Sequence, residues 1–160
     1  MKLFSSILLV ITLFSCSKPG SSPATDRSLE NLTDKYFIMT NSVSDPAYPI
    51  GNGVSTTDLY HDWYKDECVL DDLRMFKSTG QYLNDNGATK CDPAEPQTAT
   101  LSWRFIENNT KIETTQEPYK DTLTILINDG TTLKYTIIKR WAPGGNSSTY
   151  LWTETWQKHN

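Results

Sequence analysis

The chain has 160 residues, 37% of them hydrophobic, and a formal net charge of -4, with a sequence pI of about 5.1. This length fits one domain with a hydrophobic core, and the acidic balance excludes the basic surface that nucleic-acid binding requires. Thr, Trp and Tyr are plentiful, and this bias favours half-buried β-strands over helices.

Residues 1–15 are typical of a bacterial lipoprotein signal peptide. Lys2 provides a short positive region, and the apolar run at residues 3–14 is too short to span a bilayer as a helix. The run ends at Leu13-Phe14-Ser15-Cys16, which resembles the lipobox cleaved by signal peptidase II, although Phe14 is larger than that pattern prefers. We therefore expect Cys16 to be lipidated and its acyl chains to anchor the protein in a membrane. An ordinary secretory signal, with Cys16 discarded, is the alternative.

Residues 16–28 predict a flexible tether, because they are rich in Pro, Ser and Gly and have no apolar periodicity. The folded domain is then expected at residues 29–160. Residues 17–20 lack the acidic surface-export signal that sometimes follows a lipidated cysteine. The sequence thus predicts a monomer in the cell envelope, anchored to the outer membrane and facing the periplasm rather than the cell surface.

The three cysteines are consistent with one lipid anchor and one disulfide. Once Cys16 is assigned to the lipid, Cys68 and Cys91 remain as a pair in an oxidising compartment, where a bridge persists. A zinc site is the rival interpretation, but two cysteines without nearby histidines are too few ligands. The bridge would close a loop of about 24 residues and stabilise the fold by about 3 kcal/mol.

The first half of the domain contains one clear strand and a long polar stretch. Residues 29–34 predict one helical turn, and residues 35–42 the first strand. Residues 45–67 contain two prolines and an Asn-Gly pair, so we expect a long loop there. Within that loop, four apolar residues are spaced for one face of a short helix across a barrel end: Leu59, Tyr60, Trp63 and Tyr64.

Regularly spaced turn signals separate the remaining strands, and Asp129-Gly130 is the strongest of these signals. No helical pattern of about 10–15 residues lies between them, which argues against a parallel α/β sheet. The sequence predicts an all-β fold, an eight-stranded antiparallel up-and-down barrel with a long loop after the first strand, because closure removes the sheet edges. The further strands are expected at residues 70–76, 81–84, 98–107, 111–116, 122–127, 131–139 and 148–157.

The two cysteines also lie in a distinctive hairpin pattern. A C-x-x-D-D sequence precedes an F-x-x-x-G-x-Y hairpin, and G-A-T-K-C-D-P follows it: Cys68, Asp71, Asp72, Phe76, Gly80, Tyr82, Gly87, Ala88, Thr89, Lys90, Cys91, Asp92 and Pro93. This combination resembles the lipocalin-like domain of Bacteroidetes envelope lipoproteins, over roughly residues 32–156. The resemblance implies an exported, lipid-anchored, eight-stranded calyx. Lipocalin-type first strands usually open with a Gly-x-Trp pair, whereas Asp34 and Tyr36 stand at those places here.

The last predicted strand provides the candidate ligand site. Period-2 alternation places Tyr150, Trp152, Glu154 and Trp156 on one face, and the neighbouring strand adds Tyr135. If this face points inward, it lines a cavity with one carboxylate among aromatic rings, which suits a small apolar or amphipathic ligand. The alternative is that the rings fill the barrel. Glu154 would then pair with an arginine such as Arg104 or Arg140, because an unpaired buried charge is costly.

No pattern predicts catalysis, a metal site or a cofactor. His61 lies between Asp58 and Asp62 without a recognisable nucleophile motif, so a surface histidine fits better than a general base. Asp71 and Asp72 suit a calcium site with a third oxygen donor, but acids beside a disulfide more often accept hydrogen bonds from turn amides.

Two functions are consistent with the sequence. The first is a lipid-anchored envelope protein that holds a small apolar or amphipathic ligand in its calyx. The second is an envelope interaction protein whose barrel is filled by side chains and which acts through its outer surface or through residues 45–67.

Overall fold

The structure is a computed structural model that describes residues 28–141 and 147–160. The predicted signal peptide, the predicted lipidation site Cys16 and the predicted tether up to residue 27 lie outside the described residues. In the part of the chain that the structure describes, no helix has the length and apolar character needed to cross a membrane.

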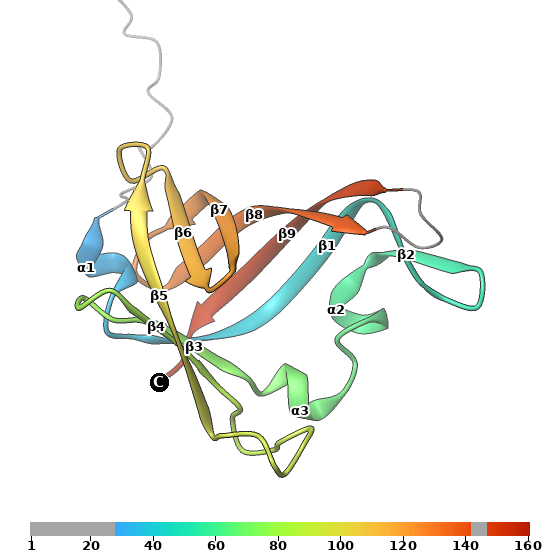
Figure 1. The fold of residues 1–160 in the computed structure, drawn as a ribbon, viewed down its shortest axis with the longest axis horizontal. Coiled ribbons are helices and arrows are strands. Elements are labelled where there is room, and N and C mark those ends of the chain that lie inside the picture. Colours follow the sequence, from blue (N-terminus) through green and yellow to red (C-terminus); the bar gives the residue numbers. More distant parts are fainter. Residues whose placement is uncertain (1–27, 142–146) are drawn as a thin grey trace, which may run out of the picture.

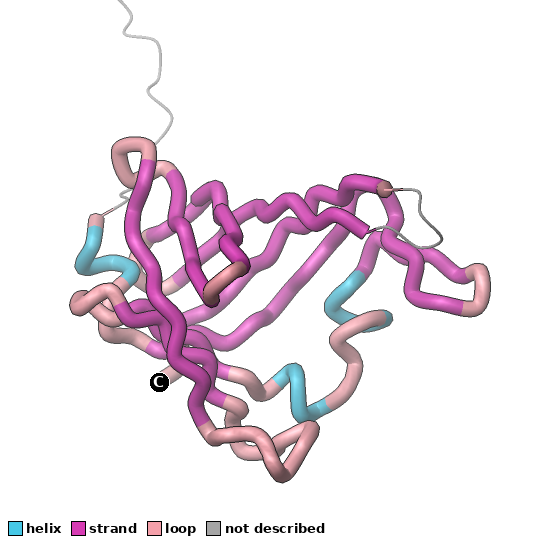
Figure 2. The backbone as a smooth tube through the Cα atoms, in the orientation of Figure 1, coloured by secondary structure: helices cyan, strands magenta, loops and turns pink. Residues whose placement is uncertain are grey.

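Within the described residues, eight antiparallel strands close into an up-and-down barrel, as predicted (Figure 1). Neighbouring strands in the barrel follow one another along the chain, and β1 closes the ring by pairing with β9. Strands make up most of the backbone, and a longer loop joins β4 to β5 (Figure 2). The barrel strands are β1 (Tyr36–Gly51), β3 (Leu73–Phe76), β4 (Gln81–Asp85), β5 (Thr98–Ile106), β6 (Lys111–Gln116), β7 (Tyr119–Asn128), β8 (Thr132–Trp141) and β9 (Ser148–Lys158).

A long connection does separate the part of β1 that pairs with β9 from the next barrel strand, but most of residues 45–67 form regular structure instead of a loop. β1 continues to Gly51, and the Asn52-Gly53 turn leads into β2 (Val54–Asp58), an extra strand that pairs with β1 outside the barrel. The prolines do not end β1, because both lie where its pairing with β2 is irregular. Pro46 lies within the register shift between Val43 and Tyr48, and Pro49 lies at the start of the shift that ends at Gly51. A missing amide hydrogen is tolerated at such irregular positions.

The helices in the described residues are short: α1 (Leu29–Leu32), α2 (Leu59–Asp62) and α3 (Glu67–Leu70). α1 and α2 lie where the sequence predicts helical turns. α3 is not predicted, and it delays the start of β3 to Leu73. The side chain of Asp58 caps α2 by accepting a hydrogen bond from the His61 amide at 3.1 Å.

His61 is a surface residue that belongs to this cap. Its ring Nδ1 lies 2.8 Å from Asp58 Oδ2, and its side chain is 72% exposed. The hydrogen bonds from the His61 ring and amide lower the pKa of Asp58. The Asp58–His61 pair therefore stabilises the start of α2, which agrees with the surface role expected from the sequence.

Apolar side chains fill the barrel end beside α1. Leu32, Phe37, Phe76, Leu133 and Trp156 are each at most 2% exposed. Phe37 points inward from β1, whereas Tyr36, at the position where a lipocalin-type strand has Trp, is only partly buried. Leu32 and Phe37 thus help to close this end without the Gly-x-Trp pair.

Hydrogen bonds join α1 to the end of β7. Asn31 Nδ2 donates to the Asn128 carbonyl at 3.3 Å, and Asn128 Nδ2 donates to the Ser28 carbonyl at 3.2 Å. The closed end is therefore sealed by apolar packing beneath a helical turn that is tied to the barrel wall.

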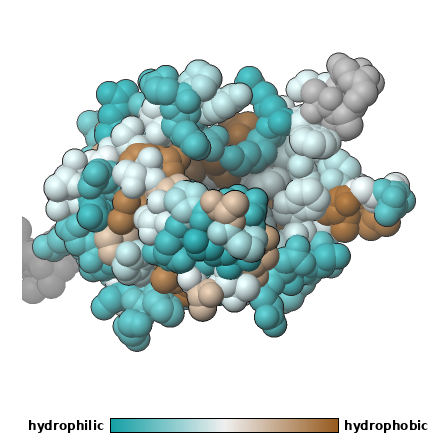
Figure 3. Space-filling view, turned by 60° about the horizontal axis from the view of Figure 1, so that its bottom comes forward, coloured by the Kyte–Doolittle hydropathy of each residue, from teal (hydrophilic) through white to brown (hydrophobic). Residues whose placement is uncertain are grey.

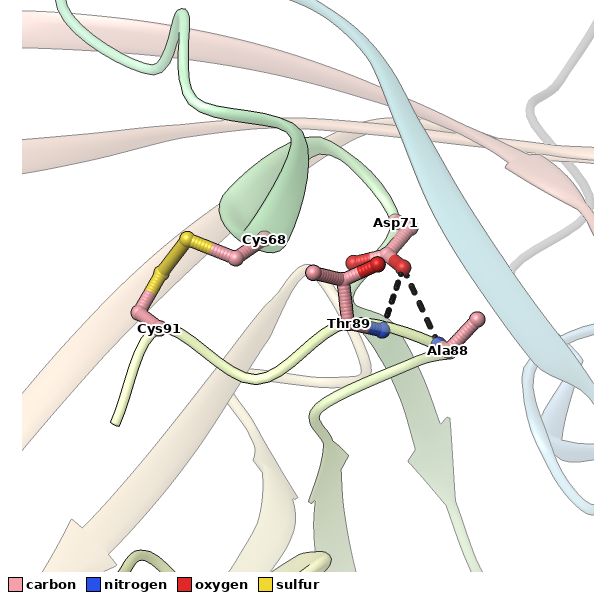
Figure 4. Close-up of a disulfide and its surroundings, with 5 residues drawn as sticks. All are labelled: Cys68, Asp71, Ala88, Thr89 and Cys91. Carbon is pink, nitrogen blue, oxygen red and sulfur yellow. Dashed lines mark hydrogen bonds between the residues drawn. A yellow bond between two sulfur atoms is a disulfide. The ribbon is translucent and has the colours of Figure 1, made fainter. Parts of the chain in front are cut away.

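Cys68 and Cys91 form the predicted disulfide, with 5.1 Å between their Cα atoms (Figure 4). Cys68 precedes β3 and Cys91 follows β4, so the bridge ties the two ends of the β3–β4 hairpin. Beside it, Asp71 Oδ2 accepts hydrogen bonds from the amides of Ala88 and Thr89 at 3.0 and 2.8 Å (Figure 4). Asp71 therefore fixes the loop after β4, which is the structural role that its place beside the disulfide suggests.

Candidate functional site

The barrel interior contains a partly open cavity of about 390 Å³ in the half away from α1. Strands β3 to β9 provide its walls, and Tyr64 contributes from the segment between α2 and α3. Its apolar and aromatic lining residues are Tyr64, Tyr82, Leu101, Leu123, Tyr135, Ile137 and Trp152. Its polar lining residues are Arg74, Asn84, Thr114, Gln116, Asp121, Lys139 and Glu154. On the face shown in Figure 3, hydrophobic residues lie in a hollow between hydrophilic ones and also on a projecting part at the right of the view.

The predicted inward face of the last strand does point into the barrel. Tyr150, Trp152, Glu154 and Trp156 are each at most 7% exposed, whereas Leu151 is 42% exposed. The five predicted ligand-site residues nevertheless lie at different depths. Tyr135, Trp152 and Glu154 line the cavity, Trp156 belongs to the closed-end core, and Tyr150 packs against Tyr48 near the other end of β9.

Arg74 is the charged partner of Glu154, so the prediction of Arg104 or Arg140 is wrong. Arg74 Nη1 lies 3.5 Å from Glu154 Oε2 and donates a hydrogen bond to the Tyr135 hydroxyl at 3.0 Å. Arg104 faces outward and pairs with Glu113 at 2.8 Å. Strand β3 is short, and polar and apolar residues do not alternate regularly along it. The sequence therefore does not show that Arg74 faces inward.

Glu154 Oε2 is the centre of a buried hydrogen-bond cluster. It accepts from the Tyr135 hydroxyl, from Trp156 Nε1 at 3.1 Å and from Arg74 Nη1. The Arg74 guanidinium also lies over the Trp156 ring, with 4.1 Å between Cζ and the ring centroid, which adds a cation–π attraction. These contacts compensate for the cost of placing a carboxylate inside the barrel.

The ionisation states follow from this cluster. Burial raises the pKa of Tyr135 well above its usual value, and the charge of Glu154 raises it further. Burial lowers the pKa of Arg74, but Tyr82, Tyr135 and Glu154 outweigh that effect and raise the pKa overall. Tyr135 therefore remains a neutral donor, and Arg74 remains a cation.

Other polar atoms of the cavity wall have no hydrogen-bond partner among the described residues. They include Glu154 Oε1, Arg74 Nε and Nη2, and the hydroxyls of Tyr64 and Tyr82. Burial raises the pKa of Tyr82 to about 12 and also raises that of Tyr64. Both hydroxyls stay protonated at neutral pH, and each can donate and accept a hydrogen bond.

An ion pair and an aromatic group lie farther from the closed end. Lys139 Nζ of β8 lies 3.1 Å from Asp121 Oδ2 of β7, and both side chains are partly exposed. Tyr48 packs edge-on against the rings of Trp63, Tyr150 and Trp152, with centroid distances of 5.6, 5.0 and 5.1 Å. The sequence does not identify Tyr48 as a core residue, because it lies in the stretch predicted as a loop.

Compared with models of known protein families and with curated proteins, the chain matches none. The evidence for a function therefore lies in the cavity, in its charges and in the N-terminal sequence pattern.

Asp72, close to Arg74, predicts a pH dependence of stability. Burial raises its pKa from 3.8 to about 6, although the charge of Arg74 lowers it. The native protein thus binds more protons at Asp72 than the unfolded chain does between pH 4 and 6, so this residue's contribution to stability falls as pH rises through that window.

We expect Asp72→Asn to increase the free energy of unfolding by about 1–2 kcal/mol above pH 6 and to change it little near pH 4. Urea unfolding at the two pH values measures both effects. An equal gain at both values would show that ionisation of Asp72 does not cause the change.

Proposed function

We propose that the protein is a lipid-anchored envelope protein whose barrel binds a small apolar or amphipathic ligand. The main support is the cavity of about 390 Å³, which is lined by aromatic and aliphatic side chains around a buried polar cluster. Ligand pockets usually occupy about 300–1,000 Å³ and combine an apolar wall with a few polar groups. The cavity lies at the small end of this size range, and it has as many polar lining residues as apolar and aromatic ones.

The N-terminal sequence supports the proposed location in the cell envelope. A charged n-region, a short apolar run and Cys16 occur in the order expected of a lipoprotein signal. The lipocalin-like resemblance around Cys68 and Cys91 points to the same class of exported protein. We therefore place the barrel in the cell envelope, held at the outer membrane on its periplasmic side.

The alternative is an envelope interaction protein that acts through its outer surface or through residues 45–67. Val54 and Trp63 in that segment are 53% and 44% exposed, so it offers apolar contact area. The cavity favours ligand binding, because a barrel filled by side chains leaves no such space.

Blocking the cavity should abolish binding of an apolar probe. Leu101 of β5 lines the cavity, and its neighbour Ser102 faces solvent. We expect Leu101→Trp to weaken binding of the neutral dye N-phenyl-1-naphthylamine at least about tenfold, equivalent to about 1.4 kcal/mol, because the indole takes up ligand space. Ser102→Trp adds the same side chain on the outer face and should leave affinity unchanged. Fluorescence titration gives both values.

Equal binding by the two variants would show that the dye binds elsewhere. If the wild-type protein neither binds the dye saturably nor carries a small molecule detectable by mass spectrometry, the ligand-binding function is wrong. That result would favour the interaction protein.

A further inference from the structure

We infer that the cavity selects an electrically neutral amphiphile whose polar end both donates and accepts hydrogen bonds, and that it discriminates against alkyl anions and alkyl cations. This inference rests on the proposed function and specifies the chemical class of its ligand. It is based on the charge balance of the cavity wall, its unused polar atoms and the order of its layers.

The charges on the cavity wall cancel. Among the described residues, the charged side chains that line the cavity are Arg74, Asp121, Lys139 and Glu154. They form opposite pairs, with 3.5 Å between Arg74 and Glu154 and 3.1 Å between Lys139 and Asp121. Each cation already has a carboxylate beside it. A charged ligand would therefore find no unpaired charge of opposite sign on the cavity wall.

Burying such a charge is unfavourable, because it loses its hydration and gains no free partner. An alkyl carboxylate could reach the unused donors of Arg74, but it would place a second negative charge beside Glu154, which already balances the Arg74 cation. Asp72 does not line the cavity, but it also interacts electrostatically with Arg74. An alkyl ammonium would in turn compete with Arg74 and Lys139 for their carboxylates.

The unused polar atoms match a neutral polar group. Glu154 Oε1 accepts hydrogen bonds, Arg74 Nε and Nη2 donate them, and the Tyr64 and Tyr82 hydroxyls do both. A hydroxyl or primary amide end satisfies such a mixed set, whereas a carboxylate offers only acceptors and an ammonium only donors. A neutral group therefore fits the wall in hydrogen-bonding character as well as in charge.

The layers of the wall orient such a ligand. On β8 and β9 the paired residues run outward from the closed end as Tyr135 with Glu154, then Ile137 with Trp152, then Lys139 with Tyr150. Leu123 is paired with Ile137 and extends the apolar middle layer. The polar end of an amphiphile would contact the deep Arg74–Glu154 cluster, and its alkyl part the layer of Leu123, Ile137 and Trp152.

Three probes with one alkyl chain test the inference: decanol, decanoate and decylamine. They compete with N-phenyl-1-naphthylamine for the wild-type protein at a neutral pH, at which the acid and the amine are both charged. We expect decanol to bind about tenfold more tightly than either charged probe, corresponding to about 1.4 kcal/mol.

Variants of the outer ion pair should shift this preference predictably. Asp121→Asn leaves Lys139 unpaired, and the affinity for decanoate relative to decanol should rise about fivefold, as expected for a unit charge near a solvated site. Lys139→Gln should shift the preference toward decylamine by a similar factor. Both positions are partly exposed, so the barrel is expected to fold in each variant. Glu113→Gln, which breaks the outward-facing ion pairs with Arg104 and Lys120, is the control and should leave the preference unchanged.

Decanoate or decylamine binding as tightly as decanol would overturn the inference and leave the ligand-binding function intact. An unchanged preference in Asp121→Asn and Lys139→Gln would equally overturn it. If neither the dye nor any of the three probes binds, both the inference and the proposed function are wrong.

Discussion

Replacement of Cys68 and Cys91 together by alanine is expected to lower the free energy of unfolding by about 3 kcal/mol. The bridge joins residues 23 positions apart, and its removal restores conformational entropy to the unfolded chain. The folded state keeps other links at this place, since Asp71 still accepts hydrogen bonds from the amides of Ala88 and Thr89. We therefore expect the double variant to keep its barrel while losing stability.

Urea unfolding with and without a reducing agent measures the effect. Reduction should lower the stability of the wild-type protein by a similar amount, and it should leave the double variant unchanged. A double variant as stable as the oxidised wild-type protein would show that the bridge does not constrain the unfolded chain as the entropy model requires.

Local signals in the sequence were sufficient to predict the barrel. Gly80 and Gly130 adopt φ values of +87° in the predicted turns, a conformation that glycine reaches without strain. Between the turns, alternation assigns the inward face of each longer strand, as it does for Trp152 and Glu154. Turn chemistry and alternation depend on neighbouring residues, so one sequence reveals them.

Features that depend on distant partners were not predicted. The extension of β1 past Pro46 depends on pairing with β9 up to Asp45 and with β2 beyond it. Prolines signal a break when only their neighbours are considered. Tyr48, placed by that extension, consequently becomes a core residue that the sequence assigns to a loop.

The partner of Glu154 is the clearest example of a feature that depends on residues distant in the sequence. Arg74 lies 80 positions away in the sequence, and its other hydrogen-bond acceptor, Tyr135, lies 61 positions away. Only closure of the barrel brings β3 opposite β8 and β9. The cost of an unpaired buried charge predicts that Glu154 has a cationic partner, but it does not say which arginine provides the charge.

Glu154→Leu is expected to lower the free energy of unfolding by about 3 kcal/mol, within the range for breaking a buried ion pair. The substitution leaves the Arg74 cation without its carboxylate and removes the acceptor used by Tyr135 and Trp156. The Arg74 side chain is 34% exposed, so water screens part of its charge and the lower end of that range applies.

A double-mutant cycle with Arg74→Met separates the charge effect from packing. Because the second substitution removes the stranded cation, we expect the double variant to recover at least about 1 kcal/mol of the loss. Glu113→Leu is the matched control: its partners Arg104 and Lys120 are 67% and 54% exposed, so losing these ion pairs should cost under about 1 kcal/mol. If Glu154→Leu costs no more than Glu113→Leu, or if Arg74→Met adds to the loss, the buried cluster does not hold the barrel wall together. In that case the cavity lining would owe its arrangement to the aromatic packing around Trp152 and Trp156 alone.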